Sequence, residues 1–260
     1  KAAATHFTCP FCGKTVSNAW DDVIDDVYQR ILKYVPPLVK GAQKLKRQTR
    51  ECKLEFIHKH QFDTSMSNNM DEHVRATKPI CDKHKRRAVL LEAQEKGWPK
   101  PEAIDWERFA QRIRADGFLD LLDGVVESYH TSPYGGVYAH MVQVYNECGG
   151  GARYRNQAML SKKLEMNRVG YYGQRGAFEL FNALADAFLH DPVSALGPAE
   201  LGAFRESEFV SDILVPTAGV ILIQQDMQAE LGREVSFDEA WDKMKETAEY
   251  GDVIAPLQKT

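Results

Sequence analysis

Residues 209–231, FVSDILVPTAGVILIQQDMQAEL, include the longest strongly apolar stretch of the chain, 213–223. The pattern predicts a long helix over 209–231. Pro216 is expected to kink this helix, because proline donates no backbone hydrogen bond and its ring crowds the preceding turn. The apolar stretch is far shorter than the ~20 residues that a membrane-spanning helix needs. We therefore expect no transmembrane helix.

Helical patterns continue on both sides of this stretch. Apolar residues at helical spacing predict a helix from about residue 18 to the Pro36-Pro37 pair and another from Cys81 to Lys96, which Gly97 caps. Ser236 and Glu239 form the capping-box pattern of a last helix that ends near Gly251. Further helices are expected over 105–114, 118–129, 137–147, 157–166 and 174–189. The predicted fold class is mainly α, with a few short strands at most, near the first cysteines.

Composition places the chain among ordinary folded proteins. Its 260 residues are 43% hydrophobic and 27% charged, which is typical of globular domains. The N-terminal residues lack the pattern of a secretion signal, and five cysteines in a chain of this size suit reduced thiols or a metal better than a disulfide framework. We therefore expect an intracellular protein.

Charge divides unevenly along the sequence. Residues 1–177 carry 28 Lys and Arg against 21 Asp and Glu, a net +7, whereas residues 178–260 carry 5 against 16, a net −11. Two interpretations are open. The charges can meet across the fold as solvated surfaces, or the basic part can face an anionic partner.

Two cysteine-containing pairs indicate a metal site. Cys9-Pro10-Phe11-Cys12 is a CxxC turn, and Cys81-Asp82-Lys83-His84 repeats its spacing with histidine in the second place. Together, Cys9, Cys12, Cys81 and His84 complete a Cys3His set for one zinc ion. Four protein ligands leave no open position for water, so the predicted role of the zinc is structural.

Other interpretations of these residues stay open. The four ligands could be unpaired thiols and a surface histidine, and His58 and His60 near Cys52 could form a rival set. Cys148 is expected to be an isolated thiol.

Catalytic patterns are missing from the sequence. It has no HExxH, no phosphate-binding glycine loop and no GxSxG. The pairs Asp25-Asp26 and Asp120/Asp123 could serve acid-base chemistry, but solvent exposure on a helix is the commoner explanation. We expect the protein not to be an enzyme.

The segment GYYGQRG at 170–176 combines three glycines, two tyrosines and an arginine. Glycines allow close backbone approach, and the rings could stack on a base or surround a cation. The alternative is a tight turn whose tyrosines pack under the following helix. Trp98 and Trp106 are expected to be core anchors.

Several short segments follow one another in a fixed order along the chain: CPFC at 9–12, CDKH at 81–84, EKGWP at 95–99, IDW at 104–106, GYYGQRG at 170–176, SEFVSDILVP at 207–216 and AEYG at 248–251. This ordered set resembles a known family, the fungal restriction-of-telomere-capping-four-like domain. The resemblance runs from Cys9 to about Pro256. It implies a nuclear protein connected by name with telomere capping, and no catalytic activity. An acidic residue usually follows LVP in the family, where this chain has Thr217, and 40–75 and 131–152 look longer than the family core.

The predicted organisation is a single domain over 1–260, with a zinc knuckle at 7–97, a helical body at 98–256 and a loop-rich insertion at 40–78. The preferred function is a non-enzymatic nuclear module that binds DNA or chromatin and reads a modified base through the aromatic loop. The alternative is a protein-interaction scaffold that uses the acidic C-terminal helices. Membrane and small-molecule partners are not expected. The predicted nucleic-acid contacts are Arg47, Lys85, Arg86, Arg87, Arg153, Lys162, Tyr171, Tyr172 and Arg175.

Overall fold

The computed structural model describes residues 6–8, 15–17, 24–26, 28–29, 53, 70–129, 134–156, 159, 168–190 and 196–257. The chain forms two compact units, Lys1–Glu92 and Ala93–Thr260. The sequence predicted one domain over 1–260, made of a zinc knuckle at 7–97 and a helical body at 98–256. Within the described ranges, no helix is both long and apolar enough to cross a membrane.

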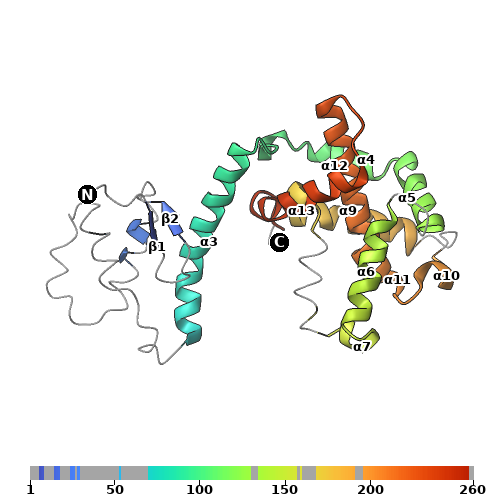
Figure 1. Ribbon diagram of the computed structural model, residues 1–260, viewed down its shortest axis with the longest axis horizontal. Coiled ribbons are helices and arrows are strands. Elements are labelled where there is room, and N and C mark those ends of the chain that lie inside the picture. Colours follow the sequence, from blue (N-terminus) through green and yellow to red (C-terminus); the bar gives the residue numbers. More distant parts are fainter. Residues whose placement is uncertain are drawn as a thin grey trace. The chain divides into compact units, whose positions relative to one another are not determined.

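The N-terminal unit begins with two short strands, β1 (His6–Thr8) and β2 (Thr15–Ser17), which pair antiparallel (Figure 1). They flank the CxxC segment, where the sequence predicted short strands. Short helical pieces at 24–26 and 28–29 carry the buried side chains of Ile24 and Tyr28.

Helix α3 (Met70–Glu95) begins earlier than predicted. Residues 70–78 are helical, so the prediction of a loop-rich insertion that extends to residue 78 was wrong at its C-terminal end. Pro79 lies inside the helix. Because proline has no backbone N–H, the helix lacks one of its backbone hydrogen bonds at this position. Gly97 follows with φ +67°, the left-handed conformation expected of its cap.

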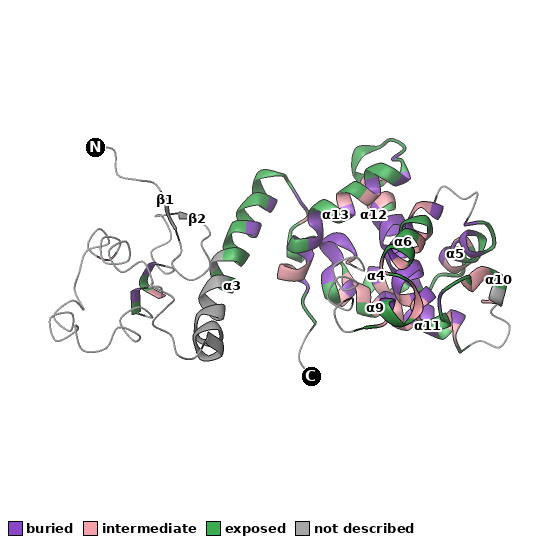
Figure 2. Ribbon diagram, turned by 60° about the horizontal axis from the view of Figure 1, so that its bottom comes forward, coloured by how far each residue is buried: buried purple, intermediate pink, exposed green. Residues whose placement is uncertain are grey.

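The C-terminal unit is built around α12 (Val215–Leu231). Every residue from Val215 to Ile223 is buried (Figure 2), as expected of a helix that is apolar on all sides. Helix α9 (Gly173–Phe188) and helix α13 (Phe237–Ile254) pack against α12 and against each other.

The remaining helices of this unit surround that centre. They are α4 (Trp106–Ile113), α5 (Asp116–Ser128), α6 (Gly135–Glu147), α7 (Gly151–Tyr154), α10 (Pro198–Leu201) and α11 (Glu206–Phe209), with 3-10 turns η4 (Pro101–Ala103) and η5 (Gly170–Tyr172). The described part of the chain is therefore mainly helical, as the sequence predicted. The helix predicted over 157–166 lies almost wholly outside the described residues.

A π-helical turn precedes Pro216. The sequence predicted one helix over 209–231, and the structure divides it into α11, the π-helix η6 (Val210–Leu214) and α12. Proline cannot donate to the turn before it, and a π turn is one way in which a helix accommodates that loss. Thr217, which follows the Leu-Val-Pro triplet, is buried and donates to Ile213 O (2.6 Å).

Candidate functional site

The Gly170–Gly176 segment brings the backbone of η5 directly against α13. Gly170 and Gly173 both have φ +58°, and a Cβ on Gly173 would lie 2.1 Å from Gly251 O. A Cβ on Gly251 would lie 1.9 Å from Gly170 O. No side chain fits at either place, so the predicted role of these glycines in close backbone approach is confirmed.

This approach buries both tyrosines of the segment. Tyr171 and Tyr172 are each only 4% exposed, and their rings lie 4.7 Å apart. Tyr172 also packs on Phe109 (4.7 Å between centroids). Neither ring has an open face for a base, so the structure matches the alternative of a tight turn with packed tyrosines.

The hydroxyls of both tyrosines converge on one carboxylate of α12. Tyr171 donates to Asp226 Oδ2 (2.6 Å), and Tyr172 donates to the same oxygen. Arg112 of α4 donates to Asp226 Oδ1 (2.7 Å) and also to Leu222 O (3.1 Å) and Gln225 Oε1 (2.9 Å). We call Arg112, Tyr171, Tyr172 and Asp226 the Asp226 cluster. It joins α4, η5 and α12.

Electrostatics favour one protonation state of this cluster. Burial and the neighbouring Asp226 raise the pKa of both Tyr171 and Tyr172 well above the ordinary tyrosine value. Burial alone would lower the pKa of Arg112, but Asp226 and Tyr172 together raise it. The tyrosines therefore stay neutral donors and Arg112 stays a cation.

A pocket of about 580 Å³ lies over the Asp226 cluster. Its walls come from the 96–105 segment with α4 on one side and from the last turns of α12 on the other, and Lys243 of α13 also lines it. Ile104, Met227 and Leu231 supply apolar surface. The volume is in the range of small-ligand and peptide side-chain pockets.

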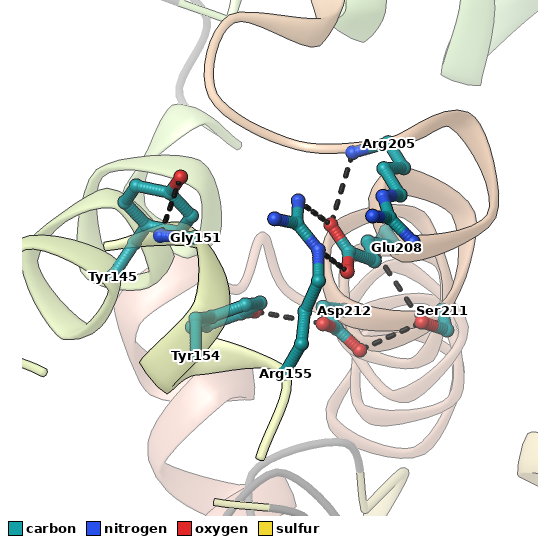
Figure 3. A network of polar contacts seen from close by, with 8 residues as sticks. All are labelled: Tyr145, Gly151, Tyr154, Arg155, Arg205, Glu208, Ser211 and Asp212. Atoms are coloured by element: carbon teal, nitrogen blue, oxygen red, sulfur yellow. Dashed lines mark hydrogen bonds and ion pairs between the residues drawn. The ribbon is translucent and has the colours of Figure 1, made fainter. Parts of the chain in front are cut away.

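A second polar network holds α7 to η6 (Figure 3). Asp212, 1% exposed, accepts from Tyr154 Oη (2.7 Å) and from Ser211 Oγ (2.7 Å). Arg155 binds Glu208 through two hydrogen bonds of 2.6 and 2.7 Å. Burial and Asp212 raise the pKa of Tyr154, which keeps it a donor. These contacts give the buried polar groups their hydrogen-bond partners. They also fix the position of α7 relative to α11 and η6.

The predicted nucleic-acid contacts belong to several different elements. Lys85, Arg86 and Arg87 are exposed on α3 in the N-terminal unit. Arg153 is exposed on α7, whereas Arg175 lies over the ring of Trp106 (4.1 Å) in the C-terminal unit. Arg47 and Lys162 lie outside the described residues.

The predicted zinc site is only partly within the described chain. Cys9 and Cys12 lie outside it, and the backbone of Cys81 and His84 belongs to α3 but their side chains are not described. Among the described residues, no group of three or more His, Cys, Asp or Glu is placed to hold a metal ion. Cys148 is a free thiol, as predicted, and its sulfur donates to Tyr145 O (3.1 Å).

The carboxylate pairs considered for catalysis lie on exposed surfaces. Asp25 pairs with Lys53 (2.5 Å) and Asp26 with Lys83 (2.7 Å), and Asp120 and Asp123 are exposed. Trp98 is buried, as expected of a core anchor, whereas Trp106 is half-buried beneath Arg175.

Sequence reasoning missed Asp226 and Arg112. They are 114 residues apart, and neither belongs to a short motif. The one available signal was an ionisable residue, Asp226, three residues after the apolar run of α12 ends at Ile223.

Fold and site together define a mainly helical protein with a buried central helix and a pocket at the end of that helix. Residues 130–256 match the family model of the RTC4-like domain, the family that the ordered segments of the sequence resemble. The matched range includes residues 131–152, which the sequence predicted to be longer than the family core. It does not include the two cysteine-containing pairs or α4. No curated protein and no solved structure matches the chain.

Proposed function

We propose that the protein is a non-enzymatic nuclear module that binds DNA or chromatin through basic side chains of its N-terminal unit. One observation carries the proposal: Lys85, Arg86 and Arg87 are consecutive and exposed on α3. The unit of residues 1–92 holds 17 Lys and Arg against 11 Asp and Glu, a net +6. Residues 93–260 hold 16 against 26, a net −10. The N-terminal unit therefore carries the net positive charge that attracts phosphate groups.

The family supports the nuclear part of this proposal. The name of the RTC4-like domain refers to telomere capping, a process of the nucleus, and residues 130–256 match that family model. Base reading by Tyr171 and Tyr172 is left out of the proposal because both rings are buried.

One structural zinc ion, held by Cys9, Cys12, Cys81 and His84, belongs to the same proposal. Cys81 and His84 are one helical turn apart along α3, a spacing from which two ligands can reach one ion. Bound zinc would tie the start of the chain to the helix that carries the basic residues. Metal analysis of the purified protein tests this part: one zinc per chain is expected, and its loss in Cys12→Ser.

Binding is tested by titration of fluorescent single- and double-stranded DNA over a range of salt concentrations. The variant is Arg86→Ala with Arg87→Ala. The matched control is Arg114→Ala with Arg205→Ala, two exposed arginines of the C-terminal unit. We expect the first variant to reduce the slope of log affinity against log salt by about two, one for each phosphate contact. Equal behaviour of the two variants, or no binding at low salt, argues against the proposal.

A protein-interaction scaffold is the second candidate. Its support is a stripe of exposed carboxylates on α13, formed by Asp238, Asp242, Glu246 and Glu249. Their spacing of four, four and three residues keeps them on one side of the helix.

A further inference from the structure

The pocket over the Asp226 cluster has a polar floor that is already satisfied. Asp226 accepts hydrogen bonds from Arg112, Tyr171 and Tyr172, and Arg112 reaches four acceptors. These groups hold the pocket in shape, because each has its partner within the protein. A ligand must therefore be recognised by the walls.

Two lining residues of opposite charge, one on α4 and one on α12, have no ion-pair partner among the described residues. The backbone N–H of Arg108 on α4 donates to the side chain of Asp105, the N-cap residue of that helix. The guanidinium of Arg108, which lines the pocket, forms no ion pair with a described residue. Glu230 of α12 likewise has no ion-pair partner among the described residues. The other cations of the lining are all paired: Arg112 with Asp226 at 2.7 Å, and Lys96 and Lys243 with Glu246 at 2.8 and 3.3 Å.

The pocket lining that contains these two charged residues also has apolar side chains, and one of them is exposed to solvent. Ile104 and Met227 are half-buried in the lining, and Leu231 at the rim is 50% exposed. A small molecule held in the pocket would leave the rim uncovered, whereas an extended chain would cover it.

We propose that this pocket binds a short peptide segment of a partner protein that carries a carboxylate for Arg108, a cationic side chain for Glu230 and an apolar side chain between them. The charge pairs set which peptide binds and in which direction, and the apolar contacts supply most of the affinity. This goes beyond DNA binding, because the site lies in the acidic C-terminal unit.

The test uses the full chain and two short fluorescein-labelled peptides, one with the order glutamate, leucine, leucine, lysine and one with the reverse order. Fluorescence anisotropy measures binding to wild type, Arg108→Glu and Leu231→Ala. The matched controls are Arg114→Glu, an exposed arginine at the end of α4, and Leu257→Ala, a leucine that is also 50% exposed. Neither control residue lines the pocket.

We expect one peptide order to bind, and Arg108→Glu and Leu231→Ala each to weaken it about tenfold or more. Both controls should bind like wild type, and a peptide with lysine in place of glutamate should regain affinity for Arg108→Glu. Circular dichroism melting of each variant separates a lost contact from a lost fold.

Three results would overturn the proposal: neither peptide binds, Arg108→Glu and Arg114→Glu lose affinity equally, or free glutamate binds with the same dependence on Arg108. The last result would indicate a small-molecule site. The variant Arg86→Ala with Arg87→Ala should keep its peptide affinity, so failure of the DNA proposal is distinguishable from failure of this one.

Discussion

The carboxylate of Asp226 accepts hydrogen bonds from three side chains that lie far from it in the sequence. Its carboxylate accepts from Arg112 at 2.7 Å and from Tyr171 at 2.6 Å, and it also accepts from Tyr172. Donors from two separate elements, α4 and η5, therefore share one carboxylate of α12. Removing such a shared acceptor costs more than removing a surface charge, because the donors that remain are left without a partner.

We predict that Asp226→Asn lowers the free energy of unfolding by about 2 kcal/mol, the size of a hydrogen bond to a charged group. Urea unfolding followed by circular dichroism measures it. Asp186→Asn is the control and should be close to neutral, since the Asp186 side chain is 81% exposed and its one polar partner among the described residues is His190. Equal effects of the two changes would contradict the importance given to the Asp226 cluster.

The same cluster predicts loss of stability at alkaline pH. The folded-state pKa values of Tyr171 and Tyr172 are raised, first by burial. Their contribution is therefore fully present below the ordinary tyrosine pKa of about 10 and is lost as pH rises toward the folded-state values. Unfolding free energy should fall from about pH 10 upward. The double change of Tyr171→Phe with Tyr172→Phe should make that fall shallower; an unchanged slope would count against the assignment.

At the scale of the element, helix ends and close approaches decide stability. The capping box predicted for the last helix is confirmed: Ser236 Oγ accepts from Glu239 N (3.2 Å), and Glu239 accepts from Ser236 N (3.0 Å). Arg233 and Ser236 hold the pKa of Glu239 at about 2, below its ordinary value. Its contribution is present above the ordinary carboxyl pKa and is lost as pH falls toward about 2.

We therefore predict that Ser236→Ala lowers stability by about 1 kcal/mol. Ser207→Ala is a suitable control, because Ser207 is exposed within α11 and does not cap a helix. Thermal melting compares the two. If Ser236→Ala melts like wild type, α13 does not depend on this cap.

Replacing Gly173 or Gly232 distinguishes the cost of backbone strain from the cost of a steric clash. Both have positive φ, +58° and +61°, but a Cβ on Gly232 meets nothing within 4 Å. Gly232→Ala should cost about 1 kcal/mol of backbone strain. Gly173→Ala adds a clash with Gly251 O, so we expect a several-fold larger loss in chemical denaturation. Similar losses would mean that η5 and α13 move apart easily.

At the scale of the whole molecule, the chain consists of two units of opposite net charge, +6 and −10. The buried residues around α12 all belong to the second unit, which therefore has a core of its own. If the zinc proposal holds, the first unit owes part of its stability to the metal.

Chelation should therefore act on one unit only. Removal of zinc is expected to lower the melting of the first unit and to leave the unfolding transition of the second unchanged, since metal binding free energy belongs to the unit that holds the ligands. Differential scanning calorimetry with and without chelator measures both transitions. The fragment 93–260, melted alone, serves as the reference for the second unit. A chelator-sensitive transition in that fragment would contradict this division.

Several features followed from the sequence by itself. Apolar spacing and cap residues predicted α9, α13 and the Gly97 cap, because these depend on hydrogen bonds and contacts between residues a few positions apart. The glycines of the 170–176 segment were predicted to allow close approach, since only glycine combines positive φ with a missing side chain.

Only the tertiary structure decided the rest. Whether Tyr171 and Tyr172 face solvent or the core depends on α4 and α12, and the sequence left both interpretations open. The partnership of Arg112 with Asp226 joins residues 114 positions apart. The π turn at Val210–Leu214 places Asp212 within reach of Tyr154 on another helix. The physical reason is the same in each case: long-range packing determines which polar groups lose water, and no local pattern specifies which partner replaces it.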